Sequence, residues 1–229
     1  MPEETSPGGS TILRYAKSLW AKPQVGVADE EVAEFAASRE RVYKELFGEA
    51  QSIYHEVLPL VPHIDVHTYV RSSPKGCVYV LVTSGMSDLA MRVPRAAGAD
   101  APRRVELIFY CTEPKKEYLE TLRWVARFPH DQKTWLSFGH TVPNGNPPAP
   151  FWGSEILDTL LFMPTIVTRD QNLPQQLVLA GDPVHFLWVV PLSTPECNLK
   201  LEKGFSAILD LFDKNRHPHI FDATRKSYV

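Results

Sequence analysis

The sequence has little cysteine and nothing that resembles a secretion signal. Its three cysteines, Cys77, Cys111 and Cys197, form no CxxC pair, and their odd number argues against a framework of disulfides. Each lies beside apolar residues, so we expect Cys77 and Cys111 to be buried, reduced thiols in neighbouring strands. The first ten residues lack the basic stretch and the apolar run of a leader peptide. These absences predict a cytoplasmic protein.

A surplus of positive charge and long apolar runs are also missing. The 24 Lys and Arg residues are outnumbered by 27 Asp and Glu residues, which gives a formal net charge of -3. This balance does not favour a polyanion, so we expect neither nucleic acid nor a membrane surface as a partner. No stretch approaches the roughly 20 apolar residues that span a membrane. Because no glycine-rich phosphate loop occurs, we also expect no cofactor and no small-molecule substrate.

Length and composition favour one folded domain. The chain has 229 residues, of which 44% are hydrophobic and 22% are charged, and such values are typical of soluble globular proteins. A chain of this length buries a large core without disulfides or metals. For residues 1–27 we expect a mobile segment with a short helix between Ile12 and Trp20. Residues 28–229 are then predicted to form a single domain.

The spacing of apolar residues predicts a helix followed by three strands. From Asp29, a candidate N-cap, apolar residues recur every three or four positions as far as Val57, and Gly48 is a point at which this helix could divide. After Pro62 the period changes to two, which predicts a half-buried strand over 64–71. Residues 77–83 and 104–111 are rich in β-branched and aromatic residues and predict two further strands.

The second half of the chain adds helices and strands in mixed order. Residues 118–127 return to helical spacing, whereas 143–150 contain four prolines and predict an irregular loop. Strands are predicted over 156–162, 176–179 and 184–190, the last of them central because it is almost entirely apolar. A Ser-Thr-Pro-Glu start at 193–196 predicts a helix that continues to Phe212. The whole order predicts an α/β (α+β) fold, a mixed β-sheet flanked by helices.

Several motifs occur in an order that is typical of one family. Residues 79–89 are a strand that runs into a Ser-Gly-Met-Ser-Asp-Leu turn. Val-Glu-Leu-Ile-Phe follows at 105–109, Leu-Arg-Trp-Val-Ala at 122–126, Phe-Gly-His at 138–140 and Phe-Leu-Trp-Val-Val-Pro-Leu at 186–192. Near the end, residues 222–225 form an Asp-x-x-Arg pattern. From Val61 to Val229 the sequence resembles a Suppressor of fused domain.

The resemblance implies a fold like the N-terminal domain of Suppressor of fused and a protein that binds another protein. Animal members of the family carry a second domain after this one, and the two domains clamp a transcription-factor peptide. This chain stops at Val229, which implies the single-domain bacterial type, similar to immunity proteins that neutralise toxins. We therefore expect a non-enzymatic protein of immunity or regulatory type, whose partner is another protein such as a toxin.

The family motifs contain residues for which we expect mainly structural roles: Gly85, Ser87, Asp88, Gly139, His140, Asp222 and Arg225. Gly85 should take a positive φ in a tight turn, and Ser87 or Asp88 should cap the chain that follows. His140 should hold the adjacent loop by a hydrogen bond. Asp222 and Arg225 should form a local ion pair or bind the C-terminal segment down.

A metal site is the alternative to a binding function. His63, Asp65 and His67 alternate along a predicted strand and would share one face, and two imidazoles with a carboxylate can bind Zn or Fe. This set would support a metal-dependent enzyme. Because Ile64 and Val66 occupy the opposite, apolar face, we prefer the interpretation that the three polar residues face solvent or a helix edge.

The proline-rich loop ends in two adjacent aromatic residues, Phe151 and Trp152, which are candidates for partner binding. Prolines reduce the entropy that a loop loses on ordering, and Trp is enriched among residues that anchor interfaces. The alternative is that Phe151 and Trp152 fold back and seal the core beneath the loop.

Overall fold

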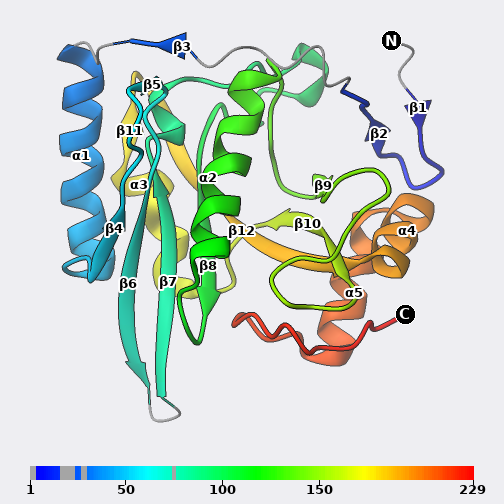
Figure 1. Cartoon of the computed structure of the whole chain (residues 1–229). Helices are drawn as coiled ribbons and strands as arrows, with labels where there is room; N and C mark the ends of the chain where they lie inside the picture. The colour runs from blue at the N-terminus through cyan, green and yellow to red at the C-terminus, as the bar shows by residue number, and fades with distance from the viewer. Residues whose placement is uncertain (1–3, 16–23, 27–29, 74–75) are drawn as a thin grey trace.

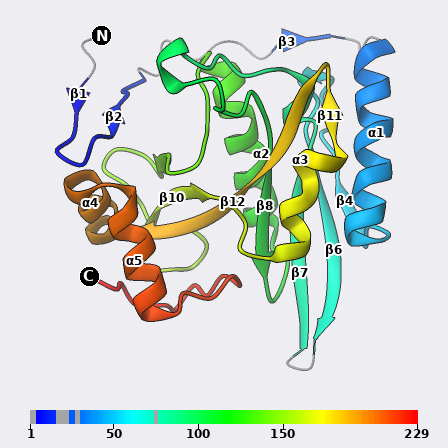
Figure 2. The same cartoon turned by 180° about the vertical axis from the view of Figure 1, so that it is seen from behind.

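A large mixed sheet with helices on both faces forms the centre of the protein (Figures 1 and 2). The structure, a computed structural model, describes residues 4–15, 24–26, 30–73 and 76–229. The helix predicted between Ile12 and Trp20 lies mostly outside the described residues, and so does the candidate cap Asp29. Among the residues that are described, no helix is long and apolar enough to cross a membrane.

The central sheet has eight strands. Along its main path they follow the order β4-β6-β7-β8-β12-β10-β9, and β11 pairs with β12. Strands β8 and β12 run parallel, and the other pairs are antiparallel. The strand bounds are β4 Ser52–Tyr54, β6 Asp65–Ser73, β7 Gly76–Ser84, β8 Arg104–Cys111, β9 Thr141–Pro143, β10 Leu157–Met163, β11 Val178–Leu179 and β12 Asp182–Ser193. This architecture confirms the predicted mixed sheet, with 184–190 in a central strand.

Two separate apolar layers cover the two faces of the sheet. Helix α2 (Lys116–Asp131) packs on one face, where Leu122 and Val125 contact a core that includes Leu81 and Leu107. The other face is covered by α1 (Glu30–Phe47), α3 (Leu173–Gln176) and α5 (Phe205–Asn215). Because both faces are covered, all of β8 is buried and alternation along it disappears.

The first helix is shorter than the sequence predicts. Helix α1 ends at Phe47, Gly48 follows with φ 84°, and Ser52–Tyr54 form the edge strand β4 instead of a second helix. Glycine takes this left-handed conformation without strain, which makes it a common helix terminator. The apolar residues beyond Gly48 therefore belong to β4 and to an exposed loop, and their helical spacing does not correspond to a helix.

One of the two predicted buried thiols is exposed. Cys111 is 2% exposed in β8, but Cys77 is exposed near the start of β7. The pairing between β7 and β8 begins only at Tyr79, so Cys77 belongs to a hairpin arm that extends beyond the rest of the sheet. The apolar neighbours of Cys77 in the sequence did not reveal this extension, and the prediction for Cys77 is wrong.

The C-terminal helix is broken in two. A capping box at Ser193 and Glu196 starts α4 (Thr194–Lys203), as the sequence predicts, but Gly204 ends it with φ 91° and α5 starts at Phe205. Short strands β1 (Glu4–Thr5) and β2 (Thr11–Ile12) form a hairpin next to α4 (Figures 1 and 2). Strands β3 (Gln24–Val25) and β5 (Leu60–Val61) form a third, two-stranded sheet.

Candidate functional site

The Ser-Gly-Met-Ser-Asp-Leu turn is organised by a buried carboxylate, that of Glu106. Its side chain is 0% exposed in β8 and accepts hydrogen bonds from Thr83 Oγ1 at 2.6 Å, Ser87 Oγ at 2.6 Å and the backbone N–H groups of Gly85 and Ser87 at 3.0 Å. Four donors satisfy both carboxylate oxygens. Gly85 is required here, because its φ is 119° and an added Cβ would lie 1.8 Å from the carbonyl oxygen of His63.

Further charged residues connect this turn to α1 through an ion pair and hydrogen bonds. Arg39, 3% exposed, donates to Asp88 Oδ1 at 2.5 Å and to Ser84 Oγ at 2.9 Å, and its Nε lies 3.9 Å from Glu106 Oε1. Arg104 donates to the backbone carbonyls of Ser87 and Asp88. Ser87 and Asp88 thus connect β8 and α1, whereas we expected them to cap the following chain.

The charged groups of this network are all buried, so each is stable only as long as it keeps its partners. Burial raises the pKa of Glu106, and the nearby Arg39 and the hydrogen bonds from Ser87 and Thr83 oppose that rise. Removing one partner would leave the others as uncompensated buried charges. The network has no open face, so its role is to fix the turn and α1 against the sheet.

A second buried carboxylate, Glu196, holds the C-terminal segment. Its side chain is 0% exposed and accepts hydrogen bonds from both Nη atoms of Arg225, at 2.7 and 2.8 Å. It also accepts from the backbone N–H of Tyr228 at 3.0 Å and from that of Ser193 at 2.8 Å. Burial disfavours the ionised form of Glu196, but Arg225 and the backbone N–H groups of Ser193 and Tyr228 together outweigh this and lower its pKa. Asp222 accepts instead from Thr224, so the local Asp222–Arg225 ion pair is not formed. Arg225 therefore holds the C-terminal segment against the domain, which was the other role expected for it.

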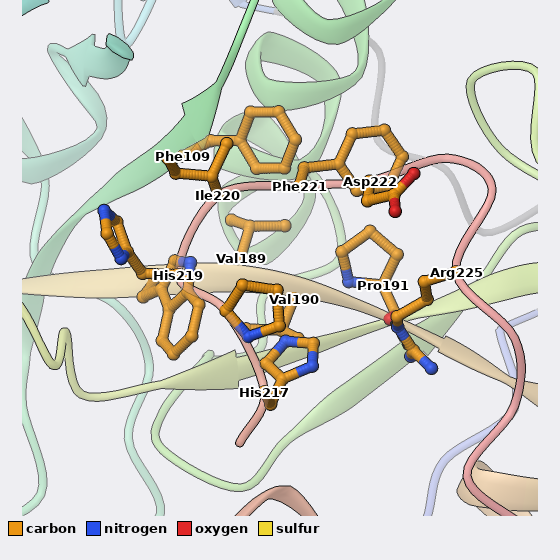
Figure 3. A pocket seen from close by; sticks show the side chains of 12 residues that line it. Phe109, Val189, Val190, Pro191, His217, His219, Ile220, Phe221, Asp222 and Arg225 are labelled. Carbon is orange, nitrogen blue, oxygen red and sulfur yellow. Dashed lines mark hydrogen bonds between the residues drawn. The ribbon is translucent and has the colours of Figure 1, made fainter. Parts of the chain in front are cut away.

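The C-terminal segment fills the wedge where β8 and β12 diverge. The N–H of Phe221 donates to the carbonyl of Tyr110 at 2.8 Å, and the Phe221 ring contacts Phe109. Figure 3 shows this segment crossing over β12, with Phe221 beside Phe109 and Arg225 near Pro191. The cavity left between them is about 20 Å³, room for one water molecule. It is therefore a packing gap and too small for a substrate.

Gly139 and His140 join β10 to the loop before β9. Gly139 donates to the carbonyl of Phe162, and Phe162 donates back to the carbonyl of His140. Burial is the main cause that lowers the pKa of His140 to about 4, and a hydrogen bond with the Trp135 backbone opposes it. An uncharged imidazole in this place suits the structural role expected from the sequence.

The two candidate partner-binding aromatics lie in the core. Phe151 and Trp152 are each 5% exposed, and the Trp152 ring packs against Phe109, Tyr118 and Phe221. Trp152 also donates through Nε1 to Thr121 Oγ1 at 3.0 Å. This arrangement corresponds to the alternative in which the aromatics seal the core under the loop, and it leaves neither ring available to a partner.

Replacing Trp152 with alanine should therefore reduce stability. We expect the free energy of unfolding to fall by about 3 to 5 kcal/mol, the usual cost of removing a large buried ring. Urea unfolding followed by circular dichroism measures it, with Trp124→Ala, at a 37% exposed position, as the control. A loss below about 1 kcal/mol for Trp152→Ala would mean that the ring is not packed as described.

The candidate metal ligands of the alternative interpretation do not form a ligand set. Within the described ranges, no group of three or more His, Cys, Asp and Glu side chains could hold a metal ion. His63 Nε2 lies 3.2 Å from Asp65 Oδ1, but His67 contacts Tyr69 Oη and the ring of Tyr43 on α1. His67 therefore covers a helix, as one of our two interpretations had it.

An exposed apolar loop is the surface feature that the sequence did not predict. It comprises residues 55–59, between β4 and β5, and we call it the apolar loop. Val57 is 93% exposed and Leu58 62% exposed, and Ile53 on the adjoining edge strand is 39% exposed. Apolar side chains displayed together in this way commonly mark interaction sites.

The base of the apolar loop is firmly held although its tip is exposed. Glu56 Oε2 accepts from Arg127 Nη2 at 2.5 Å and from the N–H of Ile64 at 3.1 Å, while the N–H of Glu56 donates to Asp65 Oδ1 at 2.8 Å. His55 Nδ1 lies 2.9 Å from Asp65 Oδ2. These contacts fix the N-terminal end of the loop, and at its other end the N–H of Gly26 donates to the carbonyl of Pro59 at 3.1 Å. The apolar tip between them is therefore presented in a defined conformation.

Comparison with solved structures identifies the fold. The chain is similar to a Suppressor of fused homologue from Neisseria gonorrhoeae FA 1090, with 15% identity and a TM-score of 0.62 over 86% of this chain and 98% of that one. It is also similar to a chain of the Sufu-Fu complex, with 12% identity and a TM-score of 0.54 over 90% of this chain and 93% of that one. No curated protein gives a significant match.

Comparison with protein families gives the assignment. The model of the family described as Suppressor of fused protein (SUFU) matches residues 61–226. This range includes the buried glutamates Glu106 and Glu196, the turn around Gly85 and the C-terminal Asp-x-x-Arg pattern. Since the match covers well over half of the sequence, the chain belongs to the Suppressor of fused family.

Proposed function

We propose that this protein is a non-enzymatic binding domain of immunity or regulatory type, which attaches to another protein in the cytoplasm and neutralises it. One similar structure is that of the Sufu-Fu complex, in which a chain of this fold is assembled with another protein. The family motifs support the same proposal, because their buried polar groups are engaged with one another in fixing the fold. A toxin is the partner that we consider first.

The observation that carries the proposal is the exposure of the apolar loop. The side chains of Val57 and Leu58 are exposed to water at the tip of this loop. The base of the loop is fixed by the contacts of Glu56 with Arg127 and Asp65. An anchor that is already ordered loses little conformational entropy when it binds. We propose that these two side chains insert into an apolar pocket of the partner.

Replacing Val57 and Leu58 together with aspartate should strongly weaken partner binding while leaving the fold intact. Each charge would have to be desolvated in the partner's pocket, so we expect affinity to fall by about 2 kcal/mol or more, roughly 30-fold. The partner is recovered from the native organism with the wild-type protein as bait, and its affinity for each variant is then measured by calorimetry.

Val178→Asp is the matched control, because Val178 is an apolar residue that is 54% exposed on β11. This variant should bind like the wild type and melt at the same temperature. Equal affinity for the wild type and the double aspartate variant would exclude the apolar loop as the interface.

The immunity role can be tested separately, by rescue of growth. Where a gene for a toxin domain lies next to the gene for this protein, co-expression should restore growth to cells that produce the toxin. The double aspartate variant should fail to restore growth. Rescue by neither form, with both forms soluble and the toxin active, would count against immunity and leave a regulatory binding role.

A further inference from the structure

The N-terminal hairpin docks on α4 through a contact that only glycine permits. The N–H of Gly8 donates to the carbonyl of Leu201 at 2.8 Å. A Cβ added at Gly8 would lie 2.3 Å from the backbone nitrogen of Gly204 and 2.7 Å from the carbonyl oxygen of Lys200. These are backbone atoms at the corner between α4 and α5, so they cannot move aside as a flexible side chain would.

The same hairpin covers a buried cation. Lys200 on α4 is 4% exposed, and its Nζ donates to Ser10 Oγ at 3.1 Å. Among the described residues Lys200 forms no ion pair, and the titratable groups around it are Cys197 and His140. Burial lowers the pKa of Lys200, as expected for an ammonium group with a hydroxyl as its partner.

Two opposing contributions therefore act on the docked hairpin. The fit of Gly8 and its hydrogen bond favour docking, whereas desolvation of the Lys200 ammonium opposes it. The hairpin itself adds little, since β1 and β2 have two residues each and two-stranded hairpins are marginal in water. Its turn is closed by Ser6, which bonds to Ser10 through both backbone and side chain.

We propose that residues 4–12 form a latch, which covers Lys200 when docked and detaches from α4 while the rest of the domain stays folded. Detachment uncovers the ammonium group of Lys200 at the α4–α5 corner. The latch lies outside the residues matched by the family model, and the proposal is independent of the binding function proposed above.

Amide hydrogen exchange by NMR tests the latch in the full-length protein. The Gly8 amide should exchange at least 100-fold faster than the Leu107 amide, because Leu107 is buried in β8 and opens only on global unfolding. In Gly8→Ala the protection at position 8 should vanish while that at Leu107 remains. In Lys200→Met it should rise by about tenfold, because the desolvated charge is gone.

Gly9→Asn serves as the control for Gly8→Ala. Gly9 has φ +81°, which asparagine tolerates, and no atom lies within 4 Å of an added Cβ, so protection at Gly8 should be unchanged. Acylation of Lys200 by a pulse of amine-reactive ester, read by mass spectrometry, should be at least tenfold faster in Gly8→Ala than in the wild type. Gly8 and Leu107 amides that exchange at the same rate, or a Lys200 equally protected in Gly8→Ala, would overturn the proposal.

Discussion

Replacing Arg39 with methionine should lower the free energy of unfolding by about 3 to 5 kcal/mol, because it leaves two buried carboxylates without their cation. Asp88 would lose its ion pair at 2.5 Å, and Glu106 would lose its one ion-pair partner within the described part of the chain, at 3.9 Å. Urea unfolding followed by tryptophan fluorescence measures the change.

Arg41→Met is the matched control, since Arg41 is exposed on the same helix, and we expect it to change stability by less than about 0.5 kcal/mol. If Arg39→Met and Arg41→Met were equally stable, the network around the turn would not hold α1 to the sheet.

Replacing Arg225 with methionine should have an effect of similar size, about 3 to 5 kcal/mol, at the other end of the chain. Glu196 has no exposed surface, and Arg225 supplies two of its hydrogen bonds as well as one to the carbonyl of Pro191. The loss should also release the C-terminal segment, so we expect faster proteolysis after residue 216 in addition to a lower melting temperature.

Lys226→Met provides the comparison, because Lys226 is the exposed neighbour of Arg225. It should melt with the wild type and keep the C-terminal segment protected. If Arg225→Met and Lys226→Met resisted proteolysis equally, the packing of Phe221, and not the Glu196 carboxylate, would be what fixes the segment.

The layered sheet could be predicted from the sequence because its signals are local. Period-two stretches and β-branched residues gave β6, β7 and β8, and the Ser-Thr-Pro-Glu start gave α4 with its capping box. The errors in the helix bounds occurred at glycines. Gly48 and Gly204 each end a helix with a positive φ, and helical spacing continues through both in the sequence.

The buried networks could not be predicted in the same way. Arg39 belongs to a charged stretch of a surface helix, and Glu106 lies in an apolar strand. Each looks ordinary until the fold brings together residues that are 49 and 67 positions apart. One signal was present: a charged residue inside the otherwise apolar run 105–109 requires buried partners. Similarly, Asp222 is near Arg225 in sequence, yet Arg225 pairs with Glu196 across 29 positions.

Exposure was the least predictable property of all. Phe151 and Trp152 follow a proline-rich loop, yet they are buried because Phe109, Tyr118 and Phe221 provide an aromatic pocket from three distant segments. Val57 and Leu58 are of types common in cores, yet they are exposed because they follow β4, a short strand at the edge of the sheet.

The proposal that the apolar loop binds the partner is tested most directly by amide hydrogen exchange of the protein alone and in complex with its recovered partner. We predict that residues 53–61 gain protection in the complex, and that amides of the Phe151–Trp152 segment exchange at the same rate in both states. Protection that appears elsewhere while residues 53–61 exchange unchanged would contradict the proposed interface.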